Sequence, residues 1–208
     1  MNVQQLRDIL PVTNNTIYMN TGWAGPTPET VLKRIAETLE EEARLGPTSN
    51  NWLDVARNIR DEAISLVAKQ LNASTDEITL THSTREGLNA IIFGMNWQNS
   101  DEILICDLEH PALTTPASVL NERYGVTVNS VAIGATDTPS EIVQKVKSAI
   151  TSKTKLIALS HIQYTCGLVM PIKEIAEESH KMNVPVLVDG AQTLGPVSYT
   201  HLTLPTKA

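Results

Sequence analysis

The stretch VPVLVDGAQ, residues 184–192, decides the fold because an unbroken apolar run ends directly on a carboxylate. A continuous apolar run of this length predicts a strand buried on both faces, as in a parallel sheet. An ionised carboxylate at the end of such a strand is costly unless a cationic group lies opposite. Asp189 therefore marks either the partner of a cationic group or the N-cap of a following helix.

Strands and helices alternate along the rest of the chain. We expect strands at 78–81, 103–105, 126–133, 156–159 and 184–188. We expect helices from Pro28 to about Gly46 with Thr27 as the cap, from about Asn51 onward, and at 88–95, 112–123, 139–150 and 172–180. Strands separated by helices require βαβ crossovers, so the fold class is α/β with a mainly parallel, doubly wound sheet.

Composition excludes several classes of protein. The 208 residues carry a net charge of -7 without a basic block, which disfavours a nucleic-acid partner. No apolar span is long enough for a membrane helix or a signal peptide, so we expect no membrane partner and a cytoplasmic location. Cys106 and Cys166 form no CxxC pair and are expected to be buried thiols. The histidines and acids show no metal-ligand spacing.

Three further segments follow predicted strands, where ligands bind in such a sheet. Residues 83–87, STREG, could hold a phosphate at a helix N-terminus or form a plain capping turn. In residues 109–111, EHP, His110 could stack on a flat cofactor, act as a base, or be an ordinary loop histidine. Residues 160–167, SHIQYTCG, would place polar groups over the same crevice.

Familiar motifs of other α/β enzymes are missing from the sequence. The chain contains no GxGxxG, so a nicotinamide-dependent Rossmann enzyme is disfavoured. It contains no Walker A loop and no GxSxG nucleophile elbow. A nucleotide-binding α/β domain that binds phosphate at Thr84 remains an alternative.

In their order and spacing, these segments resemble the class V aminotransferases, the group of cysteine desulfurases, cystine lyases, selenocysteine lyases and isopenicillin N epimerases. The resemblance extends from about Ile17 to Pro196 and includes YMNTG at 18–22 and TREGLN at 84–89. It implies an incomplete large domain of the PLP-dependent transferase fold type I, where PLP is pyridoxal 5'-phosphate. It further implies an N-terminal arm at 1–16, a partial PLP-binding domain at 17–196, and a small C-terminal domain missing from this chain.

The resemblance also implies which residues contact the cofactor's phosphate and the substrate. Thr84 and the backbone around Arg85 would hold the PLP phosphate. Asn20, Thr21 and Gly22 would line the active site on the substrate side.

Three more residues would contact the cofactor ring. His110 would stack on it and assist proton transfer, and Asp189 would pair with the protonated ring nitrogen, so these two are the expected catalytic residues. Gln192 would hydrogen-bond the ring hydroxyl. The chemistry agrees, because PLP withdraws electrons only while its ring nitrogen stays cationic, and a buried carboxylate keeps it so.

The sequence departs from the family pattern in two places. Tyr164, followed by Thr165, stands where desulfurases have an asparagine near the ring hydroxyl. The Schiff-base lysine, which the family places a few dozen residues after the DGAQ segment, is absent. Cys166 does not match the persulfide-forming cysteine of desulfurases, which also lies further along.

The last residues do not continue the pattern of strands and helices. Residues 197–208, VSYTHLTLPTKA, resemble a translated sequencing adapter, and we expect a non-native tail there. Lys207 in this tail lacks the family's lysine context, so we expect the chain by itself to be inactive.

The resemblance implies an enzyme that acts on an amino acid, with homodimerisation when the protein is full length. Residues 94–97 and 167–171 favour the lyase and epimerase branches, so the first expectation is cleavage of a C–S bond in a cysteine- or cystine-like substrate. Epimerisation like that of isopenicillin N epimerase, or sulfur transfer by a cysteine desulfurase, is the alternative. A non-catalytic module that keeps the PLP fold is the competing class.

Overall fold

The computed structural model describes residues 2–193, which form two compact units divided between Val67 and Ala68. Residues 194–208, with the predicted tail and Lys207, lie outside the described part. The first unit contains α1 (Val3–Ile9), η1 (Pro11–Asn14), α2 (Glu29–Leu45) and most of α3 (Asn50–Leu71). The domain limits predicted at residues 16 and 196 stay predictions.

Helix α2 differs from its prediction at its start and in its burial. Pro28, not Thr27, occupies the N-cap position, with ψ of 147° and no side-chain hydrogen bond to the helix. The helix ends at Gly46, whose φ of +86° suits a residue without Cβ. Its apolar residues fall on one helical face as expected, yet they are 44–59% exposed: Val31, Leu32, Ile35 and Leu39.

The second unit is a parallel sheet with a helix after each of its first three strands. Its elements are η2 (Thr75–Glu77), α4 (Thr84–Gly94), β1 (Glu102–Cys106), α5 (Pro111–Tyr124), β2 (Thr127–Val131), α6 (Pro139–Ala149), β3 (Thr154–Ser160), α7 (Ile172–His180) and β4 (Val186–Asp189). The strand order is β2-β1-β3-β4, and every pair is parallel. The predicted α/β class and the parallel sheet are confirmed.

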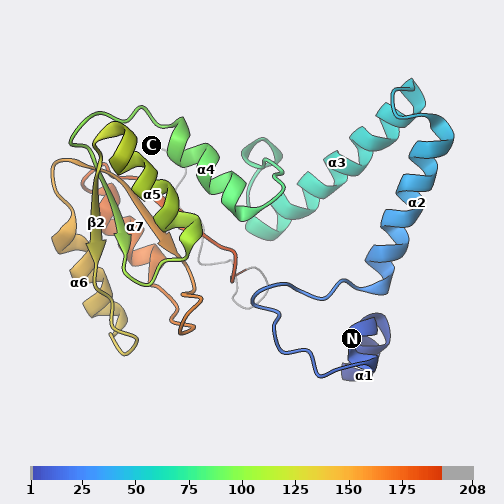
Figure 1. Ribbon diagram of the computed structural model, residues 1–208, viewed down its shortest axis with the longest axis horizontal. Helices are drawn as coiled ribbons and strands as arrows, with labels where there is room; N and C mark the ends of the chain where they lie inside the picture. The colour runs from blue at the N-terminus through green and yellow to red at the C-terminus, as the bar shows by residue number, and fades with distance from the viewer. Residues whose placement is uncertain (1, 194–208) are drawn as a thin grey trace. The chain divides into compact units, whose positions relative to one another are not determined.

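Helices cover both faces of this sheet because side chains alternate along each strand. Ile103 and Ile105 of β1 pack with residues of α4 and α5 in one core cluster. Leu104 and Cys106 pack with residues of α6 and α7 in the other cluster. Figure 1 shows the strands lying between α5 and the α6–α7 pair. This layering is the doubly wound arrangement that the alternating pattern predicted.

Parallel register brings the ends of the strands together. Cys106 of β1 lies opposite Val131 of β2, and Ser160 of β3 lies opposite Asp189 of β4. We call the edge formed by these strand ends the carboxyl edge. In β4 only the last residue is buried and the others are half-buried, whereas the apolar run predicted burial of the whole strand. The burial is lower because β4 pairs with only β3 among the described strands.

The strand predicted at 78–81 was wrong. A strand requires a neighbour for its backbone hydrogen bonds, and within residues 2–193 this segment pairs with no other strand. The N–H of Ile78 instead donates to the carbonyl of Thr75 at 3.3 Å, and Leu80 is half exposed.

In the same described part, no helix is both long and apolar enough to cross a membrane.

Two isoleucines test the core. Ile157 is fully buried in the sheet, and its replacement by Ala should lower the free energy of unfolding by about 2–5 kcal/mol through lost burial and a cavity. Ile91 on α4 is 49% exposed, so Ile91→Ala should change it by less than about 0.5 kcal/mol. Urea unfolding followed by circular dichroism measures both, and equal losses would contradict this assignment of the core.

Candidate functional site

Asp189 is the last residue of β4 and is 5% exposed, so its carboxylate sits buried on the carboxyl edge. Its Oδ1 accepts a hydrogen bond from the N–H of Ala191 at 2.9 Å, which closes a local turn. Its carbonyl accepts from the N–H of His161 at 2.9 Å, which extends the pairing of β3 and β4 by one residue. The Ala191 N–H therefore holds the carboxylate, and the His161 N–H holds the main chain of the same residue.

His110 begins α5 and acts as its N-cap. Its Nδ1 accepts a hydrogen bond from the N–H of Ala112 at 3.0 Å. Because a backbone N–H can only donate, Nδ1 must be the unprotonated nitrogen, and the neutral ring carries its proton on Nε2. The ring also meets Tyr164 edge-on, with centroids 4.9 Å apart and an interplanar angle of 82°.

Three buried polar atoms near the carboxyl edge have no hydrogen-bond partner among residues 2–193: His161 Nδ1, Gln163 Oε1 and Thr193 Oγ1. His161 directly follows β3, and Thr193 lies in the turn after β4. Burial lowers the pKa of His161 and favours its neutral ring. Such atoms nearly always bond to protein, water or a ligand, so these positions suit a polar ligand at this edge.

Glu109 is a buried residue of the site for which the sequence predicted no role. Its carboxylate, 6% exposed, accepts hydrogen bonds from Ser160, Gln163 and Cys106. Ser160 and Gln163 lie more than fifty residues further along the chain, so only the fold brings these groups together. The one available signal was a carboxylate beside His110, in the loop that follows an apolar strand.

The two thiols differ in their surroundings. Cys106 is buried, and burial together with the Glu109 carboxylate raises its thiol pKa far above the usual range. Cys166 is exposed, so the prediction that both thiols are buried was wrong for this residue. It lies in the turn that Gly167 closes with a φ of +71°, and this turn leaves it outside the core.

The predicted phosphate-binding segment forms the start of α4. Ser83 is its N-cap and accepts from the N–H of Glu86 at 3.3 Å, while Thr84 and Arg85 are exposed in the first turn. The plain capping interpretation therefore applies to Ser83, and phosphate binding by Thr84 stays a prediction. Arg85 lines a hollow of about 310 Å³ between α4 and α5 with Asn89, Phe93, Pro111, Ala112, Thr115, Pro116 and Val119.

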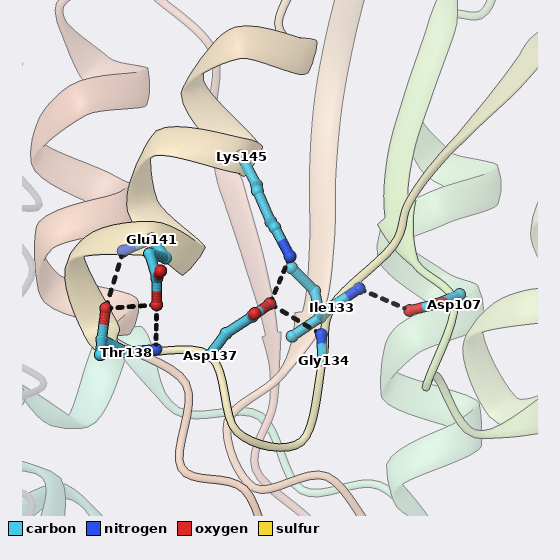
Figure 2. A network of polar contacts seen from close by, with 7 residues as sticks. All are labelled: Asp107, Ile133, Gly134, Asp137, Thr138, Glu141 and Lys145. Carbon is cyan, nitrogen blue, oxygen red and sulfur yellow. Dashed lines mark hydrogen bonds and ion pairs between the residues drawn. The ribbon is translucent and has the colours of Figure 1, made fainter.

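Carboxylates also fix the loops on the β2 side of the carboxyl edge, as Figure 2 shows. Oδ1 of Asp107, directly after β1, accepts from the N–H of Ile133 at 2.9 Å. Oδ2 of Asp137 accepts from the N–H of Gly134 at 2.7 Å and pairs with Lys145 Nζ at 2.5 Å. The loop that leads to α6 is thereby tied to the loop after β1.

The same view shows how α6 begins. Thr138 is the N-cap, and Glu141 returns a carboxylate to its N–H at 2.8 Å, which completes a capping box. Helix α6 therefore starts where Pro139 predicted.

The remaining predicted residues lie in two different parts. Asn20, Thr21 and Gly22 belong to an exposed turn of the first unit, in which the carbonyl of Asn20 accepts from the N–H of Trp23 at 3.1 Å. Gln192 is half-buried in the turn after β4. The second unit thus brings His110, Tyr164, His161 and Asp189 to one edge, while the substrate-side residues stay a prediction. Within the described range, no three acidic, His or Cys side chains could hold a metal.

Residues 17–200 match the family model for class V aminotransferases. The chain belongs to this family. A probable cysteine desulfurase from Methanothermobacter thermautotrophicus is 30% identical over 198 residues, which cover 94% of this chain and 48% of that protein.

Two solved structures from this family share the fold. A variant of C-DES with glycine covalently linked to its PLP cofactor is 28% identical, with a TM-score of 0.87 over 92% of this chain and 51% of that one. The cystine C-S lyase C-DES in complex with its product cysteine persulfide is 27% identical, with a TM-score of 0.86 over 91% and 51%. The chain spans about half the length of these relatives.

Two lysines on α6 test the ion pairs of Asp137 and Glu178. The ion pair with Lys145 and the Gly134 N–H lower the pKa of Asp137, so Lys145→Met should raise it toward the ordinary value. Hydrogen bonds from Lys147 and Lys181 lower the pKa of Glu178 to about 2, so Lys147→Met should raise that pKa and leave Asp137 unchanged. Carboxyl carbon NMR titration measures both groups.

The pH dependence of stability has a defined sign. Because the folded-state pKa of Asp137 is depressed, its ion pair stabilises the fold above the ordinary carboxyl range, and this contribution is lost as pH falls through the folded-state pKa. Lys145→Met should therefore lose less stability than the wild type on acidification. If the pKa of Asp137 shifted as much in Lys147→Met as in Lys145→Met, this would contradict the ion pair between Asp137 and Lys145.

Proposed function

We propose that the complete protein is a PLP-dependent enzyme that cleaves the C–S bond of a cysteine- or cystine-like amino acid. The observation that carries the proposal is Asp189, a buried carboxylate on the carboxyl edge of a parallel sheet, where ligands of such folds bind. Membership of the class V family and the similarity to a cystine C-S lyase support it.

The described residues fit PLP. Asp189 needs a cationic partner, and a protonated ring nitrogen would supply one. The unpartnered His161 Nδ1 and Thr193 Oγ1 offer further polar contacts at the same edge. Thr84 and the backbone of Arg85, in the first turn of α4, would hold the phosphate at the positive end of the helix dipole. Gln192 would contact the ring hydroxyl.

When bound, PLP supplies an electron sink for the negative charge that is left on Cα of the amino acid when a bond to this carbon breaks. Asp189 would keep a proton on the ring nitrogen, because its buried carboxylate favours a cation opposite. His110 would cover one face of the cofactor ring. Its Nδ1 is occupied by the N–H of Ala112, so it exchanges protons with the substrate only through Nε2.

Sulfur transfer by a cysteine desulfurase is the second candidate function. The relative from Methanothermobacter thermautotrophicus favours it, and its identity of 30% is similar to that of the C-DES structures. The complete protein separates the two reactions by product. Cysteine persulfide formed from L-cystine supports the lyase, whereas alanine formed from L-cysteine supports sulfur transfer.

We further propose a homodimer in the cytoplasm. The apolar face of α2, formed by Val31, Leu32, Ile35 and Leu39, is exposed in the single chain. Exposed apolar patches of this kind mark association surfaces. Sedimentation velocity of the complete protein tests the dimer.

Asp189→Asn tests the cofactor site. Removing one partner of a buried ion pair typically costs about 3–5 kcal/mol, so the Kd for PLP should rise by about 100-fold or more. A titration of the protein with PLP, followed by visible absorbance, measures this change. Asp101→Asn is the matched control, because Asp101 precedes β1 at the opposite edge and pairs with Lys155. Equal PLP affinity in Asp189→Asn and the wild type would remove Asp189 from this role.

A further inference from the structure

The Glu109 carboxylate lies at the centre of a buried set of donors. The N–H of Ser160 donates to both of its oxygens at 3.0 Å, and the hydroxyl of Ser160 donates to Oε2 at 2.5 Å. Gln163 Nε2 and the Cys106 thiol donate to Oε1 at 3.2 Å and 3.1 Å. Four donor groups from three residues therefore converge on one side chain.

These donors connect Glu109 to the parts of the chain that carry the site. Ser160 ends β3 and lies opposite Asp189 of β4. Gln163 is fully buried and anchors a tight turn, because its carbonyl accepts from the N–H of Gly167 at 2.7 Å. That turn holds Tyr164, whose ring meets His110 edge-on. Glu109 thus contacts the strand end beside Asp189. It also contacts the turn whose Tyr164 meets His110, the residue that follows Glu109.

Asp107, two residues earlier, provides a matched comparison in the same loop. Its carboxylate also accepts from a backbone N–H, that of Ile133, but on the β2 side of the sheet (Figure 2). Strand β2 lies at the opposite end of the strand order from β4. Asp107 therefore fixes the loop without contacting the segments that carry Tyr164 and Asp189.

We propose that Glu109 is a positioning residue that sets His110 and Tyr164 against Asp189 on the carboxyl edge. The proposal rests on the proposed function for the identity of the cofactor. A carboxylate suits the role because it only accepts, and every group around it donates. An amide would turn its NH₂ toward one of these donors and leave a buried hydrogen bond unmade. Glu109 itself makes no contact with substrate in this scheme.

The test compares Glu109→Gln with Asp107→Asn in the full chain. Each variant replaces one carboxylate of the same loop with the isosteric amide. The first readout is the proton NMR signal of the His110 ring without ligand, assigned with His110→Ala. The second is the Kd for PLP, together with the visible circular dichroism of the bound PLP, which reports the orientation of its ring.

We expect Glu109→Gln to move the His110 signal, weaken PLP binding by about tenfold or more and change the visible dichroism. Asp107→Asn should leave all three readouts at their wild-type values. Equal readouts in the two variants, at whatever thermal stability, would overturn the positioning role.

Two further results keep the test decisive. If Glu109→Gln does not fold, Ser160→Ala replaces it, since this variant removes the 2.5 Å bond and keeps the carboxylate. An unchanged His110 signal in Ser160→Ala then overturns the proposal. If the wild-type protein binds no PLP, the proposed function fails, whereas the His110 signal still decides whether Glu109 positions that ring.

Discussion

The parallel backbone pairing of β1, β3 and β4 is the constraint on which the site depends. It places Ser160 opposite Asp189 and brings the loop after β1 beside both. A slip of one residue would turn every side chain of a strand to the other face. The two core clusters prevent such a slip, because each accepts alternate residues of β1 and β3. The hydrophobic packing thus fixes the positions of polar groups that contribute little to it.

Much of the second unit could be predicted because β1 and β3 are buried. The apolar runs around Leu104 and Leu156–Leu159 leave few alternatives to strands covered on both faces, and α7 begins and ends where the periodicity placed it. Segment 78–81 has the composition of a strand but no partner among the described strands. Local sequence shows what a segment prefers, while strand pairing depends on distant residues.

The candidate site was predictable to a similar extent. Asp189 stands directly after an apolar run and His110 four residues after another, which placed both at the carboxyl edge in advance. The role of Glu109 depends on Ser160, 51 residues away, and on Gln163, 54 residues away, so no local pattern indicates it. The capping role of His110 is local, yet it became visible only once α5 was seen to begin at Pro111.

The contrast between the two thiols has a practical consequence. Cys106 is enclosed and holds its proton tightly, whereas Cys166 faces solvent in the turn that carries Tyr164. The sequence contains no other cysteine. Among the residues of this sequence, a maleimide dye would therefore label Cys166, two residues from the aromatic ring that meets His110, and spare Cys106. The fold supplies a ready attachment point for an optical reporter beside the carboxyl edge, without any engineered residue.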